Sequence, residues 1–277
     1  MMQLKWFGGR RGAAKKNGGE SMQAERRNLL SEQSDFFVRE AYKTLRTNVS
    51  FSLAEQEDCP VIMVTSAFQN EGKSTTALNL AISYAMADRK VLIVDCDLRR
   101  PQIARLLNER TDIGLSNLIM NPKLRSDAVR HTKIKGLDAI LAGNIPPNPS
   151  ELLGSARMER LLQELRNEYD VIVLDSPPVN VVTDAVVLAP RTDGVLFLVR
   201  ANYSERGAVV RAVEQMKYAK AKILGFVLNE VETEKSPFGY GKYRGKYYGR
   251  YGRYSRYGYG SQLWEEEDDQ EATEIKA

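Results

Sequence analysis

The residues best suited to do chemistry lie in the segment 67–75, which reads AFQNEGKST. It matches the phosphate-binding loop pattern GxxxxGK[ST], with alanine in place of the first glycine. In such a loop, backbone N–H groups surround phosphate oxygens, the lysine contacts the β- and γ-phosphates, and the hydroxyl binds Mg²⁺. The predicted nucleotide-binding residues are Ala67, Phe68, Gln69, Asn70, Glu71, Gly72, Lys73, Ser74 and Thr75. Lys73 is also a catalytic candidate, and Ser74 is a metal-ligand candidate.

Three aspartates follow apolar runs elsewhere in the chain. Asp95 and Asp97 end the run KVLIVDCD, and Asp175 ends DVIVLD. A carboxylate at the end of an apolar strand commonly holds Mg²⁺ beside a phosphate loop, although a helix N-cap or a turn is the ordinary alternative. Asp95 and Asp97 cannot point the same way in extended chain, so one is expected to face the γ-phosphate and the other the metal. The following Arg99 and Arg100 could neutralise phosphate charge or form a solvated surface pair.

These residues need a scaffold that brings strand ends together. Short runs rich in Val, Ile and Leu occur at 61–66, 90–95, 137–143, 170–175, 194–200 and 222–229. They do not alternate with polar residues, which is typical of strands buried on both faces of a parallel sheet. Longer amphipathic segments at 74–87, 150–168 and 205–219 are the predicted helices. The pattern predicts an α/β fold of the P-loop NTPase type, with a mostly parallel central sheet and helices on both faces.

Composition excludes several other classes of protein. The 277 residues are 43% hydrophobic and 27% charged, which is ordinary for a globular chain with a sizeable core. A net charge of +4 is too weak to imply a nucleic-acid partner, and the single histidine argues against a histidine triad or a multi-histidine metal site. Two cysteines indicate a reducing compartment. With no apolar leader and no long apolar stretch, we expect a cytoplasmic protein unless a partner recruits it to a membrane.

The tyrosines are unevenly distributed. Eight of the 13 fall near the C-terminus: Tyr240, Tyr243, Tyr247, Tyr248, Tyr251, Tyr254, Tyr257 and Tyr259. Residues 235–260 also carry seven Lys or Arg and no acidic residue, and the block WEEEDDQE follows. Because the segment lacks aliphatic residues for a core, we expect a disordered tail over 235–277, a flexible basic segment over 1–34 and a folded body between them.

A phosphate site together with a basic ribbon of phenols suggests transfer of a γ-phosphoryl group to tyrosine. A stacking platform for single-stranded nucleic acid is an alternative use of such a tail, because bases stack on aromatic side chains beside cations. The acidic residues 265–271 argue against it by internal competition. An inert, solvated extension is the third possibility.

Taken together, SAFQNEGKS, VLIVDCDLRRP, VIVLDSPP, the segment 143–153 and the tyrosine-rich tail resemble the bacterial tyrosine kinases. The similarity is to the separate cytoplasmic kinase subunit that Gram-positive bacteria use in capsule and exopolysaccharide synthesis and export. It implies a P-loop kinase domain over 35–234 that uses ATP and Mg²⁺ and phosphorylates the tail tyrosines of a neighbouring subunit. It also implies Asp97 and Asp175 in the metal shell, Asp95 as acceptor of the tyrosine proton, and Asn229 near the adenine.

The resemblance implies partners as well. They are a membrane adaptor and activator of the polysaccharide co-polymerase type, which would recruit the kinase to the inner face of the cell membrane, and a cognate tyrosine phosphatase. The family's Glu-x-x-Arg-x-x-Arg oligomerisation motif aligns with Glu40, Lys43 and Arg46, so a homo-oligomeric ring is expected when the tail is unphosphorylated. A septum-site or plasmid-partition type of ATPase switch is the main alternative, but such loops usually carry an extra early lysine that this chain lacks.

Overall fold

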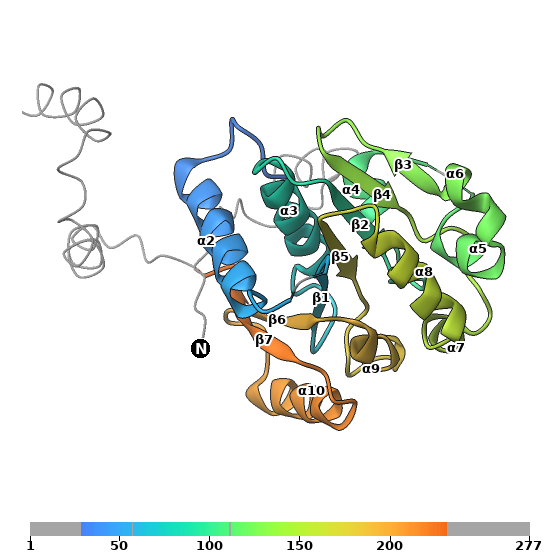
Figure 1. Cartoon of the computed structure of the whole chain (residues 1–277). Helices are drawn as coiled ribbons and strands as arrows, with labels where there is room; N and C mark the ends of the chain where they lie inside the picture. Colours follow the sequence, from blue (N-terminus) through green and yellow to red (C-terminus); the bar gives the residue numbers. More distant parts are fainter. Residues whose placement is uncertain (1–28, 57, 111, 232–277) are drawn as a thin grey trace, which may run out of the picture. The chain divides into compact units, whose positions relative to one another are not determined.

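A seven-stranded sheet forms the centre of the computed structural model, which describes residues 29–56, 58–110 and 112–231 (Figure 1). The strand order is β3-β4-β2-β5-β1-β6-β7. The strands are β1 (Val61–Ser66), β2 (Val91–Asp95), β3 (Val129–His131), β4 (Leu137–Ile140), β5 (Val171–Asp175), β6 (Gly194–Arg200) and β7 (Ile223–Asn229). Every pair of neighbours is parallel except β3 and β4. The predicted mostly parallel α/β sheet is confirmed.

Helices cover both faces of this sheet. They are α2 (Phe36–Ser52), α3 (Lys73–Ala85), α4 (Ile103–Leu107), α5 (Leu115–Met120), α6 (Arg125–Ala128), α7 (Pro149–Leu153), α8 (Ala156–Arg166), α9 (Asp184–Leu188) and α10 (Arg206–Tyr218), with 3₁₀ turns η1 (Pro122–Leu124) and η2 (Ala189–Arg191). Helix α2 lies beside α3, while α8 and α9 lie across the sheet from them (Figure 1).

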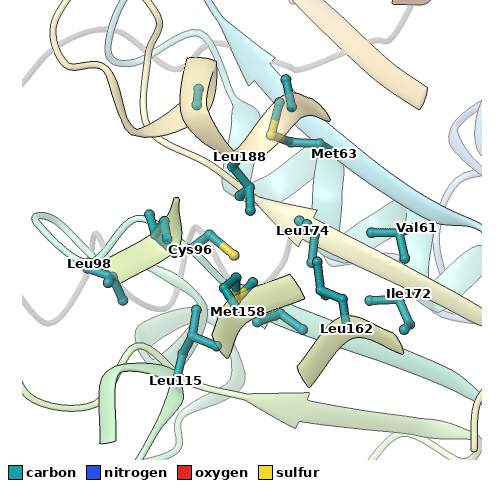
Figure 2. Close-up of a cluster of buried hydrophobic side chains, with 14 of the residues drawn as sticks. Val61, Met63, Cys96, Leu98, Leu115, Met158, Leu162, Ile172, Leu174 and Leu188 are labelled. Carbon is teal, nitrogen blue, oxygen red and sulfur yellow. The ribbon is translucent and has the colours of Figure 1, made fainter. Parts of the chain in front are cut away.

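Successive residues of β1 show why the apolar runs do not alternate with polar residues. Val61 and Met63 pack into a cluster with Met158 and Leu162 of α8 and Leu188 of α9 (Figure 2). The residues between and after them, Ile62 and Val64, pack into the other cluster, with residues of α2 and α3 such as Leu45 and Leu78. Because adjacent side chains point to opposite faces, a strand covered on both faces must be apolar at every position.

Two local features differ from the expectation. The prediction of a single helix over 150–168 is wrong, because the chain forms two helices, α7 and α8, with a break at Gly154 and Ser155. The Ser155 hydroxyl accepts a hydrogen bond from the backbone N–H of Met158 at 3.2 Å, which caps the start of α8. The short antiparallel strand β3 was not predicted, since three residues give no usable periodicity.

The body extends slightly before the predicted boundary at residue 35. Leu30 is buried against the core, and its backbone N–H donates to Asn79 Oδ1 at 2.8 Å. Residues 1–28, and the tail 235–277 with its eight tyrosines, lie outside the described residues. Within the described part, no helix is both long enough and apolar enough to span a membrane.

Candidate functional site

The phosphate loop joins β1 to α3, as the sequence predicts. Gly72 precedes the first residue of α3 and has a φ of 91°, in the left-handed region. A Cβ at this position would lie 2.1 Å from Nδ2 of Asn229. The backbone conformation therefore favours glycine at position 72, and a Cβ there would displace the Asn229 side chain. The loop leads directly into the N-terminus of a 13-residue helix, where unpaired backbone N–H groups favour an anion.

Lys73 is held within this loop. Its side chain is nearly buried, and Nζ donates to the carbonyl oxygen of Phe68 at 3.3 Å. Burial lowers the pKa of the Lys73 ammonium, against the opposing influence of the Asp175, Asp97 and Glu71 carboxylates. The lysine is thus surrounded by acidic groups and already bonded to the loop that it would serve.

The sheet brings Asp95 and Asp175 together. They are register partners on the neighbouring parallel strands β2 and β5, so the two strand-end carboxylates meet at one edge of the sheet. Both side chains are fully buried. Burial and the charge of Asp175 raise the pKa of Asp95 well above its usual value.

The hydrogen bonds of the two buried carboxylates differ sharply. Asp95 accepts from the backbone N–H groups of Asp97, Gln102 and Ile103 at 3.2, 3.1 and 3.0 Å. Among the residues that the structure describes, no donor has full hydrogen-bond geometry to either oxygen of Asp175, and the nearby Ser74 hydroxyl approaches the carboxylate without completing such a bond. Burial raises the pKa of Asp175 to about 7, although the Ser74 hydroxyl and the Lys73 ammonium act to lower it. An unpartnered buried carboxylate is costly, so Asp175 is the group most in need of a cation.

Asp97 is the accessible member of the three aspartates. Its Oδ1 accepts from the backbone N–H groups of Arg100 at 2.9 Å and Arg99 at 3.3 Å, which forms a tight turn after β2. Unlike Asp95 and Asp175, it lines the cavity described next.

A cavity of about 610 Å³ opens beside the phosphate loop. Eight of the predicted site residues line it: Gln69, Asn70, Gly72, Lys73, Ser74, Thr75, Asp97 and Asn229. Ala67, Phe68, Glu71, Asp95 and Asp175 do not line it, so only part of the predicted nucleotide and metal site faces the cavity. The volume lies within the range of small-molecule sites.

Asn229 contacts the loop rather than standing apart from it. Its Nδ2 donates to the carbonyl oxygen of Glu71 at 3.0 Å, and its side chain is almost wholly buried. The end of β7 is thereby tied to the phosphate loop.

The two arginines after Asp97 have different partners. Arg99 forms a two-pronged ion pair with the fully buried Asp184, with Nε–Oδ2 and Nη2–Oδ1 distances of 2.9 and 3.1 Å. Ser150 donates to the same carboxylate at 2.7 Å. Arg100 donates instead to Gln69 Oε1 of the phosphate loop at 2.9 Å. Of the two phosphate-neutralising candidates, Arg99 is committed to Asp184, and Arg100 lies on the loop.

Several residues of the site were not predicted. Arg200 and Glu230 line the cavity and form an ion pair at 2.5 Å, and Arg200 also donates to the carbonyl oxygen of Asn70 at 2.8 Å. Their positions at the carboxyl ends of β6 and β7 could have predicted them as site residues, because ligands bind at that edge of a parallel sheet. Asp184 offered no comparable signal, since it contacts the site only through Arg99.

The proposed oligomerisation residues lie on α2. Lys43 Nζ and Glu40 Oε1 form an exposed ion pair at 2.7 Å. Arg46 instead donates to the carbonyl oxygen of Ser83 on α3. The structure therefore brings Glu40 and Lys43 together and directs Arg46 onto its own domain.

The donor set suits Mg²⁺ shared with phosphate oxygens. In the described part of the chain, no three His, Cys, Asp or Glu side chains gather as a self-sufficient metal site. Mg²⁺ usually binds through one or two carboxylates and completes its octahedron with water and substrate phosphates. The unpartnered oxygens of Asp175, with Ser74 and Asp97 nearby, fit that arrangement.

The fold and the loop define a nucleotide-binding protein of the P-loop α/β class. The family model described as "AAA domain" matches residues 61–225. The tyrosine-protein kinase YwqD of Bacillus subtilis (strain 168) is 35% identical over 230 residues, which cover 82% of this chain and 95% of the relative. The solved chimerical protein CapA2B2 is 35% identical with a TM-score of 0.69, over 73% of this chain and 88% of that one. The chain belongs to the bacterial tyrosine-protein kinase family.

The likeness to septum-site ATPases is more distant. MinD of Pyrococcus horikoshii OT3, solved with Mg-ADP, is 22% identical with a TM-score of 0.53, over 61% of this chain and 70% of that one. It shares the fold alone. The family resemblance read from the motifs is therefore confirmed, and the positioning-switch alternative rests on nothing beyond common architecture.

Proposed function

We propose that this protein is an ATP- and Mg²⁺-dependent protein-tyrosine kinase that phosphorylates the tyrosine cluster 240–259 of another copy of itself. One observation carries the proposal. Two buried strand-end carboxylates meet at the sheet edge beside Lys73, and one of them, Asp175, lacks any described hydrogen-bond partner. This is a site with unmet capacity for a cation, next to a loop shaped for phosphate.

Each residue then has a specific part. Backbone N–H groups of the loop and the start of α3 bind the phosphates. The Lys73 ammonium, which donates to the Phe68 carbonyl in this structure, neutralises charge on the transferred phosphoryl group. Ser74, Asp97 and Asp175 would hold Mg²⁺, which supplies further charge neutralisation when bound. Asn229 and Arg200 line the same cavity, and we propose that the nucleoside binds beside them.

Asp95 is proposed to accept the proton of the attacking tyrosine. Burial and the charge of Asp175 raise its pKa, which makes the deprotonated Asp95 a stronger base than an ordinary carboxylate. Since Asp95 is fully buried and bonded by three backbone N–H groups, the turn at 97–102 must move before a phenol can reach it.

We also propose a cellular role for this kinase. A kinase of this kind would regulate capsule or exopolysaccharide synthesis and export, from the cytoplasm, where a polysaccharide co-polymerase type of adaptor recruits it to the membrane and a tyrosine phosphatase reverses its action. Unphosphorylated copies would assemble through α2, with the exposed Glu40–Lys43 pair at the contact. Phosphorylation changes the segment 235–260 from a charge of +7 to a net negative one, which would favour release of the tail and of the neighbour.

The deciding experiment is intact-mass measurement of the full chain after incubation with Mg-ATP, followed by peptide mapping. We expect successive phosphate additions located on residues 240–259, and none in a variant with all eight tail tyrosines changed to phenylalanine. ATP hydrolysis without protein phosphorylation would favour the switch ATPase. Salt-sensitive binding of single-stranded nucleic acid without phosphorylation would favour the stacking platform.

A further inference from the structure

Glu71 places a carboxylate inside a loop whose purpose is to bind anions. The side chain is fully buried, and its Oε2 accepts from the backbone N–H of Phe68 at 2.7 Å, across the loop itself. Its Oε1 accepts from the hydroxyl of Ser204. A carboxylate turned toward the phosphates would repel them. In this structure both of its oxygens are instead engaged by donors.

The other hydrogen bonds of Ser204 fix its hydroxyl group in the turn that contains it. Ser204 belongs to the turn that follows β6, where its Oγ accepts from the backbone N–H of Arg200 at 2.8 Å and its own N–H donates to the Arg200 carbonyl at 3.0 Å. A serine hydroxyl has one hydrogen to donate. With the N–H of Arg200 on its lone pair, that hydrogen is directed to Glu71.

The same end of the sheet contacts the loop at two further points. Arg200 donates to the carbonyl oxygen of Asn70, and Asn229 donates to that of Glu71, at 2.8 and 3.0 Å. Both bonds end on main-chain carbonyl oxygens of the loop, so neither of them holds the Glu71 carboxylate directly. Of the three residues that reach over from β6 and β7, Ser204 is the one that binds the carboxylate, and it does not line the described cavity.

We propose that Ser204 is a positioning residue for nucleotide binding. It holds the Glu71 carboxylate in the wall of the loop, so that the loop keeps its shape and its own negative charge stays away from the phosphates. The inference rests on the proposed function only in requiring that the loop bind a nucleotide. It gives the turn after β6 a part in phosphate binding without contact to the ligand.

Removal of the hydroxyl has a defined consequence. In Ser204→Ala, Oε1 of the buried carboxylate loses its donor and only the Phe68 N–H on Oε2 remains, so the carboxylate is held less firmly away from the phosphates. We expect about tenfold weaker binding of Mg-ADP, equivalent to about 1.4 kcal/mol. Ser204→Thr keeps the hydroxyl and should bind within about twofold of the unmodified protein. Where Glu71→Gln has already removed the charge, adding Ser204→Ala should cost less than about threefold, since little repulsion is left to expose.

The test is calorimetric titration of Mg-ADP into the full chain and these variants. Ser52→Ala is the matched control, because it removes an exposed hydroxyl from α2, where Oγ donates to the Asn48 carbonyl at 2.9 Å. Equal affinity in Ser204→Ala and the unmodified protein would overturn the inference, and so would a tenfold loss that persists in the Glu71→Gln background. If Ser204→Ala does not fold, failure of Ser204→Thr to bind as tightly as the unmodified protein overturns it. Absence of binding in the unmodified protein would instead defeat the proposed function.

Discussion

The two sides of the candidate phosphate site differ in how completely their polar groups are satisfied. On the loop side, Lys73 donates to the Phe68 carbonyl, and the carbonyls of Asn70 and Glu71 accept from Arg200 and Asn229 at the ends of β6 and β7. On the carboxylate side, Asp95 is bonded to three backbone N–H groups, whereas both oxygens of its register partner Asp175 lack a partner among the described residues.

The phosphate loop is therefore held by internal hydrogen bonds before a ligand binds, whereas the oxygens of Asp175 stay available to a cation. A loop that must surround phosphate benefits from being formed before the ligand arrives, because ordering it during binding would weaken affinity. A carboxylate that must bind a metal benefits from having no internal hydrogen-bond donors, since each such donor would compete with the cation. The burial of Asp175 without a partner costs stability, and the structure retains it where a cation is expected.

The largest expected effect comes from breaking the loop side at its charge. Lys73→Met keeps a similar side-chain length but removes the ammonium that neutralises the transferred phosphoryl group. We expect a folded protein whose tail phosphorylation falls at least about 100-fold. Intact-mass measurement after incubation with Mg-ATP checks this, with the exposed Lys135→Met as control. Undiminished phosphotyrosine in Lys73→Met would rule out this phosphate site.

The carboxylate side should show a division of labour. In Asp97→Asn and Asp175→Asn, Mg-dependent binding of ADP and activity should weaken together, by about tenfold or more in affinity, because each removes an anionic ligand. In Asp95→Asn, binding should stay within about threefold while phosphoryl transfer slows about 100-fold, as for loss of a proton acceptor. Calorimetry with and without Mg²⁺, paired with phosphorylation rates, separates the two outcomes. A binding loss confined to Asp95→Asn would reverse the assignment.

The carboxylate side should also change stability in the absence of metal. Because the pKa of Asp175 is raised to about 7, the folded state holds this proton more tightly than the unfolded state does. Unfolding therefore releases a proton between about pH 4 and 7, and the free energy of unfolding falls as pH rises through that window, by at most about 1.4 kcal/mol for each pH unit.

Asp175→Asn removes this titration. Its stability relative to the unmodified protein should rise from pH 5 to pH 8, as measured by urea unfolding with a chelator present. Asp127→Asn on the exposed surface of α6 serves as control. A stability difference that does not change with pH would contradict the burial-induced shift of Asp175.

Much of the fold was predictable from local pattern. The runs 61–66 and 194–200 coincide with β1 and β6, because a strand covered on both faces must be continuously apolar and both runs end in polar or turn-forming residues. The helix over 150–168 failed because periodicity does not register a serine cap in the middle of an amphipathic stretch. Leu30 packs on the body although it follows a basic, glycine-rich segment, and only contact with Asn79 on α3 reveals that.

The residues of the candidate site were likewise predictable only in part. The loop and the three aspartates were predictable because each follows its strand directly, and strand ends are where α/β sheets bind ligands. For Arg99 the sequence offered phosphate neutralisation or a solvated surface pair, and the structure shows neither but an ion pair with Asp184, which is 85 residues away in sequence. Ser204 carried no signal, because its partner Glu71 is 133 residues away and the contact exists only once β6 lies beside β1.

The sequence by itself determined the elements and the chemistry that each one carries, since apolar continuity and the loop pattern act over neighbouring residues. Only the tertiary structure decided which of those groups meet. The order β2-β5-β1-β6-β7 sets Asp95 beside Asp175 and brings Ser204 and Asn229 to the phosphate loop. The physical reason is that strand order, register and burial arise from packing between segments far apart in the chain. The same packing leaves one aspartate bonded and its neighbour open.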